Sequence, residues 1–248
     1  METVVKIAGL VCRFGALTVL DGIDLEVRRG EVLVVLGGSG CGKSTLLRHM
    51  VGLQGPTAGS VELFGHDLWQ VEPEERDVLL RRIGILFQSS GLFQSISLGE
   101  NVAFPLRERG GVPESAIRAV VHRKLELVGL ADAAERMPSQ LSGGMKKRGG
   151  LARAMALDPE VIFCDEPSAG LDPNAAASLD ELIRALQRRL GTTFVVVTHE
   201  LASVFAIADR IVMLREGRIA AQGTVAEIRA EPDPWVQDFL NRVAAPVA

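Results

Sequence analysis

The chain has 248 residues, of which 47% are hydrophobic and 23% charged, so its composition is that of a globular protein and its length suits one large or two small domains. Its formal net charge of −4 provides no overall basic field, which argues against nucleic acid as the main partner. No apolar run approaches the roughly 18 residues of a membrane span, and the N-terminus METVVKIAGL lacks the basic and apolar regions of a secretion signal, so we expect the protein to stay in the cytoplasm.

The N-terminal part of the chain is rich in predicted strands. Residues 4–27 predict short strands with turns at Phe14-Gly15 and Asp21-Gly22, because apolar and polar residues alternate there. Further strands are predicted at residues 60–64 and 83–87, the second of which ends at Gln88.

Between these strands, the stretch from Glu31 to Gly52 predicts a strand, a loop and a helix in succession. Its glycine-rich turn fits the pattern G-x-x-x-x-G-K-[ST], in which turns without side chains let backbone N–H groups converge on phosphate oxygens. Lys43 would bring a positive charge to the β- and γ-phosphates, and Ser44 a hydroxyl ligand to Mg²⁺. The predicted nucleotide-binding residues are Gly37, Gly38, Ser39, Gly40, Cys41, Gly42, Lys43, Ser44 and Thr45.

The middle of the chain, residues 98–158, predicts helices, most clearly at 117–128 and 142–157. After Pro159 the strand character returns with VIFCD, followed by a helix over 173–190, the strand TFVVVTH, a short helix and the hairpin RIVMLREGRIAAQG. Strands that alternate with helices favour a mainly parallel α/β sheet, into which the helical middle is inserted.

Two adjacent carboxylates, Asp165 and Glu166, end the apolar run VIFCD. Acids at the end of a buried strand are costly unless a cation or proton chemistry uses them. One of them would hold Mg²⁺, and its neighbour would polarise an attacking water as a general base.

A second anion site is predicted where Ser142 caps a helix whose first turn is Gly143-Gly144, because a bare helix N-terminus attracts negative charge. Gly149 and Gly150 continue that helix at a cost of roughly 1 kcal/mol each relative to alanine. These glycines indicate close packing or a segment that must move.

The motif LSGG, preceded by a phosphate loop and followed by VIFCDEP, resembles the nucleotide-binding subunit of ATP-binding cassette (ABC) transporters over nearly the whole chain. That resemblance implies ATP and Mg²⁺ as cofactors, Asp165 and Gln88 as metal-site residues beside Ser44, and Glu166 as the catalytic base aided by Lys43. It also makes Ser142, Gly143 and Gly144 the signature, residues 168–172 the D-loop, His199 the switch histidine near the γ-phosphate and Phe14 the aromatic residue that stacks on adenine.

The resemblance implies an α/β fold: a P-loop NTPase (RecA-like) core with a mainly parallel sheet, an N-terminal antiparallel β subdomain and an inserted α-helical signature subdomain. We expect the core with its β subdomain at residues 1–88 and 157–230, the helical subdomain at 89–156 and a C-terminal tail at 231–248. The tail would pack on its own domain, with docking on a neighbouring subunit as the alternative.

Two departures from the family pattern stand next to the signature. Met145 replaces the usual glutamine, and Lys147 stands where a second glutamine is common, so that residues 146–148 form a basic run. A solvated helix face is the commoner meaning of such a run, and a role in binding phosphate is the alternative. The segments LSGGM, GLARAMAL and PDPWVQDFLN resemble the ATPases of Mce/Mla-type lipid transport systems, which implies phospholipid or another lipid as the cargo.

The family resemblance also implies partners. The phosphate loop and the signature would meet in a head-to-tail dimer of two copies, each covering the other's ATP, and closure of the dimer would drive a separate membrane permease through the groove near Gln88. The protein would then lie on the cytoplasmic face of the inner membrane, with a substrate-binding or Mce-type lipid-binding protein as a further partner and no nucleic acid.

Three rival functions remain open from the sequence. An ABC subunit that imports a small polar solute differs only in its cargo. A soluble ABC-type ATPase acting in translation or on DNA would usually carry two cassettes or long coiled coils, and a metabolic kinase would leave LSGG unexplained.

The cysteines Cys12, Cys41 and Cys164 are odd in number and have no paired spacing, which favours reduced thiols. Cys12 and Cys164 stand in apolar runs and are expected in the core. We expect the loop amides and Lys43 to lower the pKa of Cys41.

Overall fold

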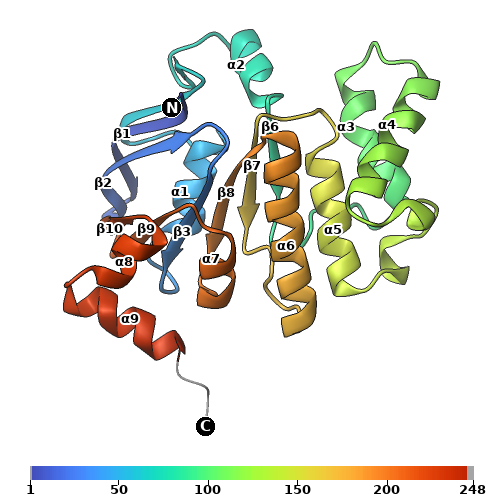
Figure 1. Ribbon diagram of the computed structural model, residues 1–248. Coiled ribbons are helices and arrows are strands. Elements are labelled where there is room, and N and C mark those ends of the chain that lie inside the picture. The colour runs from blue at the N-terminus through green and yellow to red at the C-terminus, as the bar shows by residue number, and fades with distance from the viewer. Residues whose placement is uncertain (1, 245–248) are drawn as a thin grey trace.

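The computed structural model describes residues 2–244, and its parallel strands are formed by the apolar runs of the sequence (Figure 1). A six-stranded sheet has the order β10-β9-β3-β8-β7-β6, in which only β10 is antiparallel to its neighbour. Its strands are β3 (Val32–Gly37), β6 (Ile83–Leu86), β7 (Val161–Asp165), β8 (Thr193–Thr198), β9 (Arg210–Arg215) and β10 (Arg218–Gly223). The expected parallel sheet and the C-terminal hairpin are confirmed.

A separate antiparallel sheet has the order β2-β1-β4-β5. Its strands are β1 (Thr3–Phe14), β2 (Leu17–Arg28), β4 (Ala58–Leu63) and β5 (His66–Asp67). The turn predicted at Asp21-Gly22 is wrong, because β2 runs through it. Gly22, with φ of 70°, lies where the β1–β2 register shifts, so this glycine serves a bulge inside a long strand.

The first helix, α1 (Lys43–Met50), lies between the two sheets. Leu46, Leu47 and Met50 join alternate residues of the parallel strands and the inner face of the antiparallel sheet in one core. The remaining residues of the parallel strands point to the other face, since successive side chains of a strand alternate. There they pack against helices of the second half of the chain.

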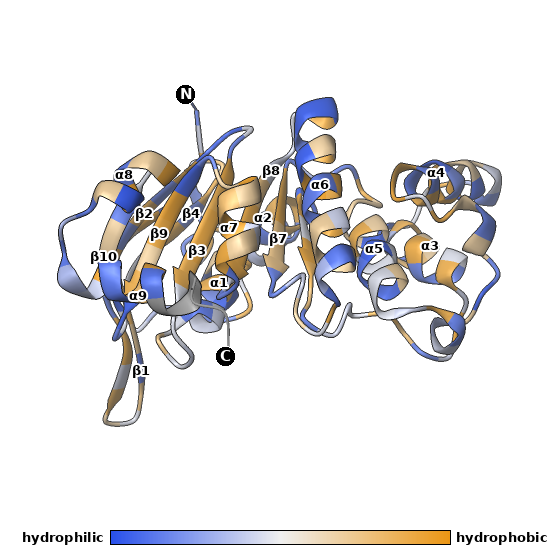
Figure 2. Ribbon diagram, turned by 60° about the horizontal axis from the view of Figure 1, so that its bottom comes forward, coloured by the Kyte–Doolittle hydropathy of each residue, from blue (hydrophilic) through white to orange (hydrophobic). Residues whose placement is uncertain are grey.

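The helices α3 (Leu98–Arg109), α4 (Glu114–Leu127) and α5 (Gly143–Ala154) gather at the end of the molecule away from the antiparallel sheet (Figures 1 and 2). Short 3-10 turns at Ala131–Ala133 and Pro138–Gln140 connect α4 to α5. The remaining helices are α2 (Pro73–Leu80), α6 (Pro173–Leu190), α7 (Leu201–Ile207), α8 (Val225–Ala230) and α9 (Pro234–Ala244). Figure 2 shows that the strands of the parallel sheet are mainly hydrophobic, whereas helices such as α4 and α6 mix hydrophilic and hydrophobic residues.

The C-terminal tail packs back on its own chain. In α9, Val236 is fully buried and Leu240 nearly so, and both belong to the core beneath α7 and α8. The last four residues of the predicted tail, 245–248, lie outside the described residues. Among residues 2–244, no helix combines the length and apolar character needed to cross a bilayer.

Candidate active site

The phosphate loop joins the carboxyl end of β3 to the first turn of α1. Gly42, with φ of 106°, precedes α1 and provides no side-chain cap, so N–H groups of the first turn are left for an anion. A Cβ at Gly42 would lie 2.8 Å from Cδ2 of Leu20, and one at Gly37 would lie 2.6 Å from the carbonyl oxygen of Leu214. Gly42 therefore requires glycine for its left-handed conformation, and Gly37 requires it because a backbone atom leaves no space for a side chain.

Lys43 is the buried cation of this loop. Its Nζ donates to the carbonyl oxygens of Gly37 and Gly38, each at 2.9 Å. An ammonium group has three donors. The side chain is thus folded along the loop, where a phosphate oxygen would meet the positive charge.

Ser44 and Asp165 provide the oxygen atoms that would hold Mg²⁺. The Ser44 hydroxyl donates to Oδ1 of Asp165 over 3.4 Å, which joins the start of α1 to the end of β7. Burial raises the pKa of Asp165 by more than the Ser44 hydrogen bond and the charges of Arg48 and Lys43 lower it. Magnesium prefers one or two carboxylates together with hydroxyl, water and phosphate oxygens. The donor set therefore fits that ion. Ser44 and the exposed Gln88 line one cavity, whereas Asp165 is not among the residues that line it.

Glu166 is held at the ends of two neighbouring strands. Its Oε1 lies 2.8 Å from Nδ1 of His199, and its Oε2 accepts from Oγ1 of Thr198 at 3.2 Å. Its backbone has φ of 46°, a left-handed conformation that costs a residue with a side chain roughly 1–3 kcal/mol. The N–H of Glu166 donates to the carbonyl of Val197 over 2.8 Å, which fastens this bend to β8.

A cavity of about 600 Å³ brings most of the predicted residues together. Residues of the phosphate loop other than Cys41 line it, together with Gln88, Glu166 and His199. It also contains two residues that the sequence analysis did not single out for this site, Val19 of β2 and Phe239 of α9. Helical spacing indicated that Phe239 belongs to a tail helix, but nothing in the sequence signalled that the helix returns to this cavity.

The signature residues lie elsewhere in the same chain. The Oγ of Ser142 accepts from the N–H of Met145 at 3.2 Å, so Ser142 caps α5 as expected, but none of Ser142, Gly143 and Gly144 lines the cavity. Phe14 is 52% exposed at the end of β1 and is also outside the cavity lining. Its role toward adenine stays a prediction.

Two expectations about neighbouring side chains are wrong. Partial burial raises the pKa of the Cys41 thiol more than Lys43 and the loop amides lower it. The basic run beside the signature is not a uniformly solvated face, because Lys147 is buried. Cys12 and Cys164 are buried free thiols as expected, and burial raises the pKa of Cys164 to about 12.

Known proteins are similar to this chain in both sequence and fold. A family model described as ABC transporter matches residues 20–169. The chain is 39% identical over 240 residues to the intermembrane phospholipid transport system ATP-binding protein MlaF of Haemophilus influenzae, covering 97% of this chain and 91% of that protein. It is 41% identical to the methionine import ATP-binding protein MetN of Rhizobium johnstonii, but spans only 66% of that protein's length.

Two solved structures of ABC transporter proteins are also similar to this chain. CbiO1 from Clostridium perfringens, described as part of an ABC transporter complex, superposes with a TM-score of 0.86 at 31% identity and covers 98% of both chains. The ATP-binding cassette MJ0796, described as a dimer in a post-hydrolysis state bound to ADP and Pi, superposes with a TM-score of 0.80 at 30% identity over 89% of this chain and 98% of that one.

Proposed function

This chain belongs to the ABC transporter family and is an ATP-hydrolysing subunit of that family, and from that premise we propose that it energises the transport of phospholipid or another lipid through a separate membrane permease. The observation that carries the choice of lipid is the match to MlaF, which covers 91% of that protein, whereas MetN extends well beyond the matched part. The segments LSGGM and PDPWVQDFLN support the same choice.

The geometry of the site supports hydrolysis by the following steps. The amides of the phosphate loop and the ammonium group of Lys43 bind the phosphates and neutralise developing charge. Mg²⁺ held by Ser44 and Asp165, with Gln88, would supply further positive charge at the phosphates. Glu166 then accepts a proton from the attacking water, and His199, 2.8 Å from that carboxylate, orients it.

A second copy of the chain would complete the site. The cavity holds the phosphate loop and the catalytic glutamate but not Ser142, Gly143 or Gly144, which occupy the start of α5 with Ser142 and Gly143 exposed. In a head-to-tail dimer, the α5 N-terminus of one copy covers the ATP of the other. Binding of ATP would close this dimer, and hydrolysis would let it reopen.

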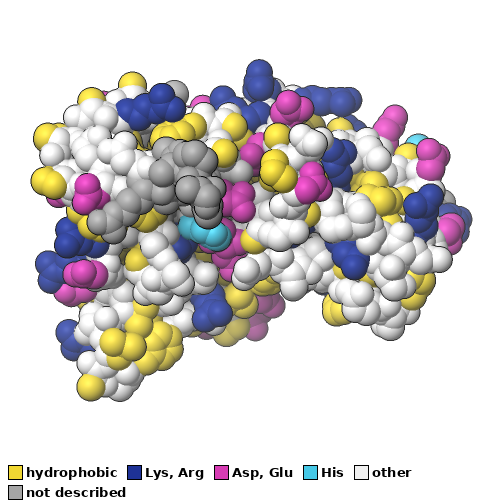
Figure 3. All heavy atoms as spheres, turned by 90° about the horizontal axis from the view of Figure 1, so that it is seen from below, with side chains coloured by type: hydrophobic (Ala, Val, Ile, Leu, Met, Phe, Trp, Pro, Cys, Tyr) yellow, Lys and Arg dark blue, Asp and Glu magenta, His cyan; other side chains and the backbone are white. Residues whose placement is uncertain are grey.

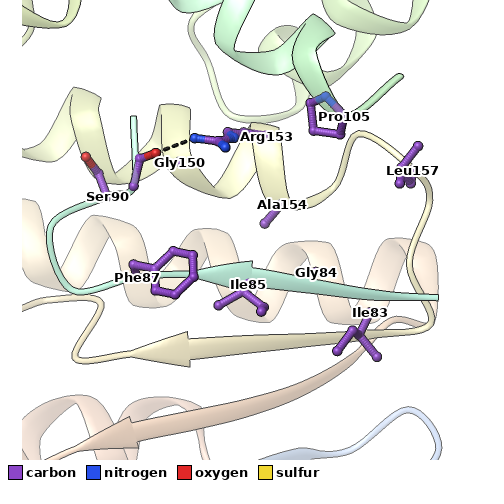
Figure 4. Close-up of a pocket in the computed structure, with 11 residues that line it drawn as sticks. Ile83, Gly84, Ile85, Phe87, Ser90, Pro105, Gly150, Arg153, Ala154 and Leu157 are labelled. Carbon is purple, nitrogen blue, oxygen red and sulfur yellow. Dashed lines mark hydrogen bonds between the residues drawn. The ribbon is translucent and has the colours of Figure 1, made fainter. Parts of the chain in front are cut away.

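The permease would dock in a groove between β6 and the helices α3 and α5 (Figure 4). The groove contains about 190 Å³ and is lined by apolar side chains such as Ile85, Phe87 and Leu157. Arg153 crosses it to hydrogen-bond the carbonyl of Gly91 (Figure 4). The guanidinium group of Arg153 also lies 4.4 Å from the centre of the Phe93 ring. Phe87 is 42% exposed directly before Gln88, so a partner bound here would touch the loop that lines the ATP cavity. Such docking would place the protein at the cytoplasmic face of the membrane.

The methionine-type importers give the specific rival, because MetN relatives reach 41% identity. A nucleic-acid machine is less well supported: on the face shown in Figure 3, basic and acidic side chains are interspersed and form no continuous basic stripe.

Isolation of the intact complex from membranes tests this proposal. We expect a membrane permease to remain bound in high salt, phospholipid to co-purify as seen by mass spectrometry, and lipid to stimulate ATP hydrolysis. Stimulation by methionine or another small polar solute without lipid would contradict the lipid cargo. Stimulation by RNA or DNA, with no membrane protein attached, would contradict transport itself.

A matched pair of variants tests the docking groove. Phe87→Ala should weaken capture of the permease, whereas Leu190→Ala, which removes an equally exposed side chain (42% for both) at the end of α6, should not. Equal capture by both variants would contradict the groove.

A further inference from the structure

Lys147 of α5 is a buried lysine that holds two backbone carbonyl groups of the active site. Only 6% of its surface is exposed. Its Nζ donates to the carbonyl oxygen of Gln88 at 2.6 Å and to that of Glu166 at 3.0 Å. Within residues 2–244 it forms no salt bridge, so neutral carbonyl dipoles are its direct partners. Burial of a charge is costly unless its donors are satisfied, which indicates that the two contacts belong to the folded site.

The contact between Lys147 and the carbonyl of Glu166 bears directly on the position of the Glu166 side chain. This residue has the left-handed backbone described above, and its carbonyl also accepts from the N–H of Ala169 at 3.2 Å. Its N–H is fastened to β8, so Lys147 holds the other side of the same residue. A shift of this peptide would move the carboxylate relative to His199 and to the attacking water.

The carbonyl of Gln88 anchors the second loop to the same helix. Two residues after Gln88, this loop also packs closely against α5 at Gly150. A Cβ at Gly150 would lie 2.5 Å from the carbonyl oxygen of Ser90. Both the loop that contains Gln88 and the strand end that contains Glu166 are therefore attached to α5. Lys147 is the one side chain among the described residues that bonds to both.

We propose that Lys147 is a positioning residue for hydrolysis: it ties α5 to the backbone of Gln88 and Glu166, so that the orientation of α5 sets the position of the catalytic carboxylate. This inference rests on the proposed dimer in one respect. Lys147 lies about 6 Å along the helix from Gly143, the first residue of α5. In the proposed dimer, the N-terminal part of α5 covers the partner's ATP at Ser142. Through Lys147 the same part of α5 also holds Glu166 of its own chain, so the two active sites are coupled.

The test compares Lys147→Met with Lys147→Gln. Methionine has a similar length and no donor, whereas glutamine retains N–H donors. We expect kcat for ATP hydrolysis to fall about 10-fold or more in Lys147→Met, because small misplacements of a catalytic group have large kinetic effects. Lys147→Gln should lie between this variant and the wild type. The Kd for ATP should stay within about twofold of the wild type in both, because Lys147 lies outside the phosphate loop.

The control is Lys146→Met, which removes the same charge one residue earlier. The side chain of Lys146 makes no hydrogen bond or ion pair within residues 2–244 and is not part of the cavity lining, so its replacement should leave kcat unchanged. The thermal midpoint of each variant is recorded alongside, because Lys147→Met takes a donor from two backbone carbonyl groups, and a loss of stability must be separated from a loss of kcat.

A double-mutant cycle with Glu166→Gln separates positioning from general stability. If Lys147 acts through Glu166, single-turnover phosphate release by the double variant should equal that of Glu166→Gln alone. Additive losses, or a kcat for Lys147→Met within twofold of wild type, would overturn the proposal. If Lys147→Met does not fold, Lys147→Leu takes its place as the apolar variant. A wild-type kcat in both Lys147→Leu and Lys147→Gln would then overturn the proposal.

The cycle also distinguishes the two hypotheses. Retention of full hydrolysis by Glu166→Gln refutes the assigned base and hence the proposed function. Loss of hydrolysis in Glu166→Gln with normal hydrolysis in Lys147→Met refutes the role of Lys147 alone.

Discussion

At the scale of single residues, Glu166, the proposed catalytic base, is held through both its backbone and its side chain. Its carboxylate is 2.8 Å from His199, while its peptide is held by β8 on one side and by Lys147 on the other. A base fixed at both ends loses little freedom in the transition state, which favours proton transfer from a positioned water.

Glu166→Gln should therefore lose about 10²-fold or more in the rate of ATP hydrolysis, the scale of a general base. Its ATP affinity should persist, because the phosphate loop is untouched. Calorimetry and phosphate release measure the two quantities separately. Lys43→Ala is the complementary variant and should weaken nucleotide binding itself, so unchanged affinity there would contradict the role of the loop.

Asp180 of α6 is a buried acid outside the active site. It is 4% exposed at a cavity between α6 and α7, and no group among the described residues bonds to its Oδ1. Burial raises the pKa of Asp180 to about 6. A hydrogen bond with Ser203 lowers this pKa in part, and the negative charge of Glu200 raises it further. The folded state thus binds this proton more tightly than the unfolded state.

Between pH of about 4 and about 6, the unfolded protein ionises Asp180 while the folded protein still keeps it protonated. The free energy of unfolding therefore falls as pH rises through this range. Relative to Asp180→Asn, the wild type should lose on the order of 2 kcal/mol of unfolding free energy across that range. Unfolding in denaturant at pH 4.5 and pH 7 measures this difference. Because other acids titrate in both proteins, a constant difference between them would contradict the assignment.

At the scale of elements, α5 is shaped by its contacts more than by its helical preference. Gly149 and Gly150 are poor helix formers, yet both are buried in its middle. The close packing that their presence indicated is found: Gly150 lies against the backbone at Ser90, and Gly149 lies against Leu98.

Gly150→Ala should destabilise the protein by about 1–2 kcal/mol even though alanine favours a helix, because the new Cβ would stand 2.5 Å from a backbone oxygen. Gly149→Ala is the matched control. Its Cβ would meet Cδ1 of Leu98 at 2.6 Å, the far end of a flexible side chain that can move. Thermal unfolding should rank Gly149→Ala above Gly150→Ala, and the reverse order would contradict this account of the packing.

At the scale of the whole molecule, the proposed dimer gives each active site residues from two copies. Lys43→Ala lacks a working phosphate loop, and Ser142→Arg would block the signature. In a mixed dimer, however, the loop of the second variant meets the signature of the first, so one site is intact.

Mixing these two inactive variants in equal amounts should therefore restore hydrolysis to roughly a quarter of the wild-type rate, since half of the dimers are mixed and one of their two sites is complete. Each variant alone serves as the control. No recovery on mixing, or full activity of Ser142→Arg by itself, would contradict the shared site.

The local motifs were predictable because short segments of sequence determine them. The phosphate loop needs glycines and a lysine at fixed spacing, the acids follow an apolar strand, and the helix at Pro173–Leu190 carries its own N-cap in Asp172. The bulge at Gly22 was missed because a glycine with positive φ serves a turn and a bulge equally well.

The sequence by itself determined the strand, loop and helix from Val32 to Met50, the acids at the end of β7 and the cap of α5, because each depends on neighbours within a few residues. Only the tertiary structure decided that Phe239 returns to the nucleotide cavity, that Phe14 stays outside its lining, and that Lys147 is buried against Gln88 and Glu166. The physical reason is distance along the chain: the burial of a side chain and the field around it depend on segments that only packing brings together.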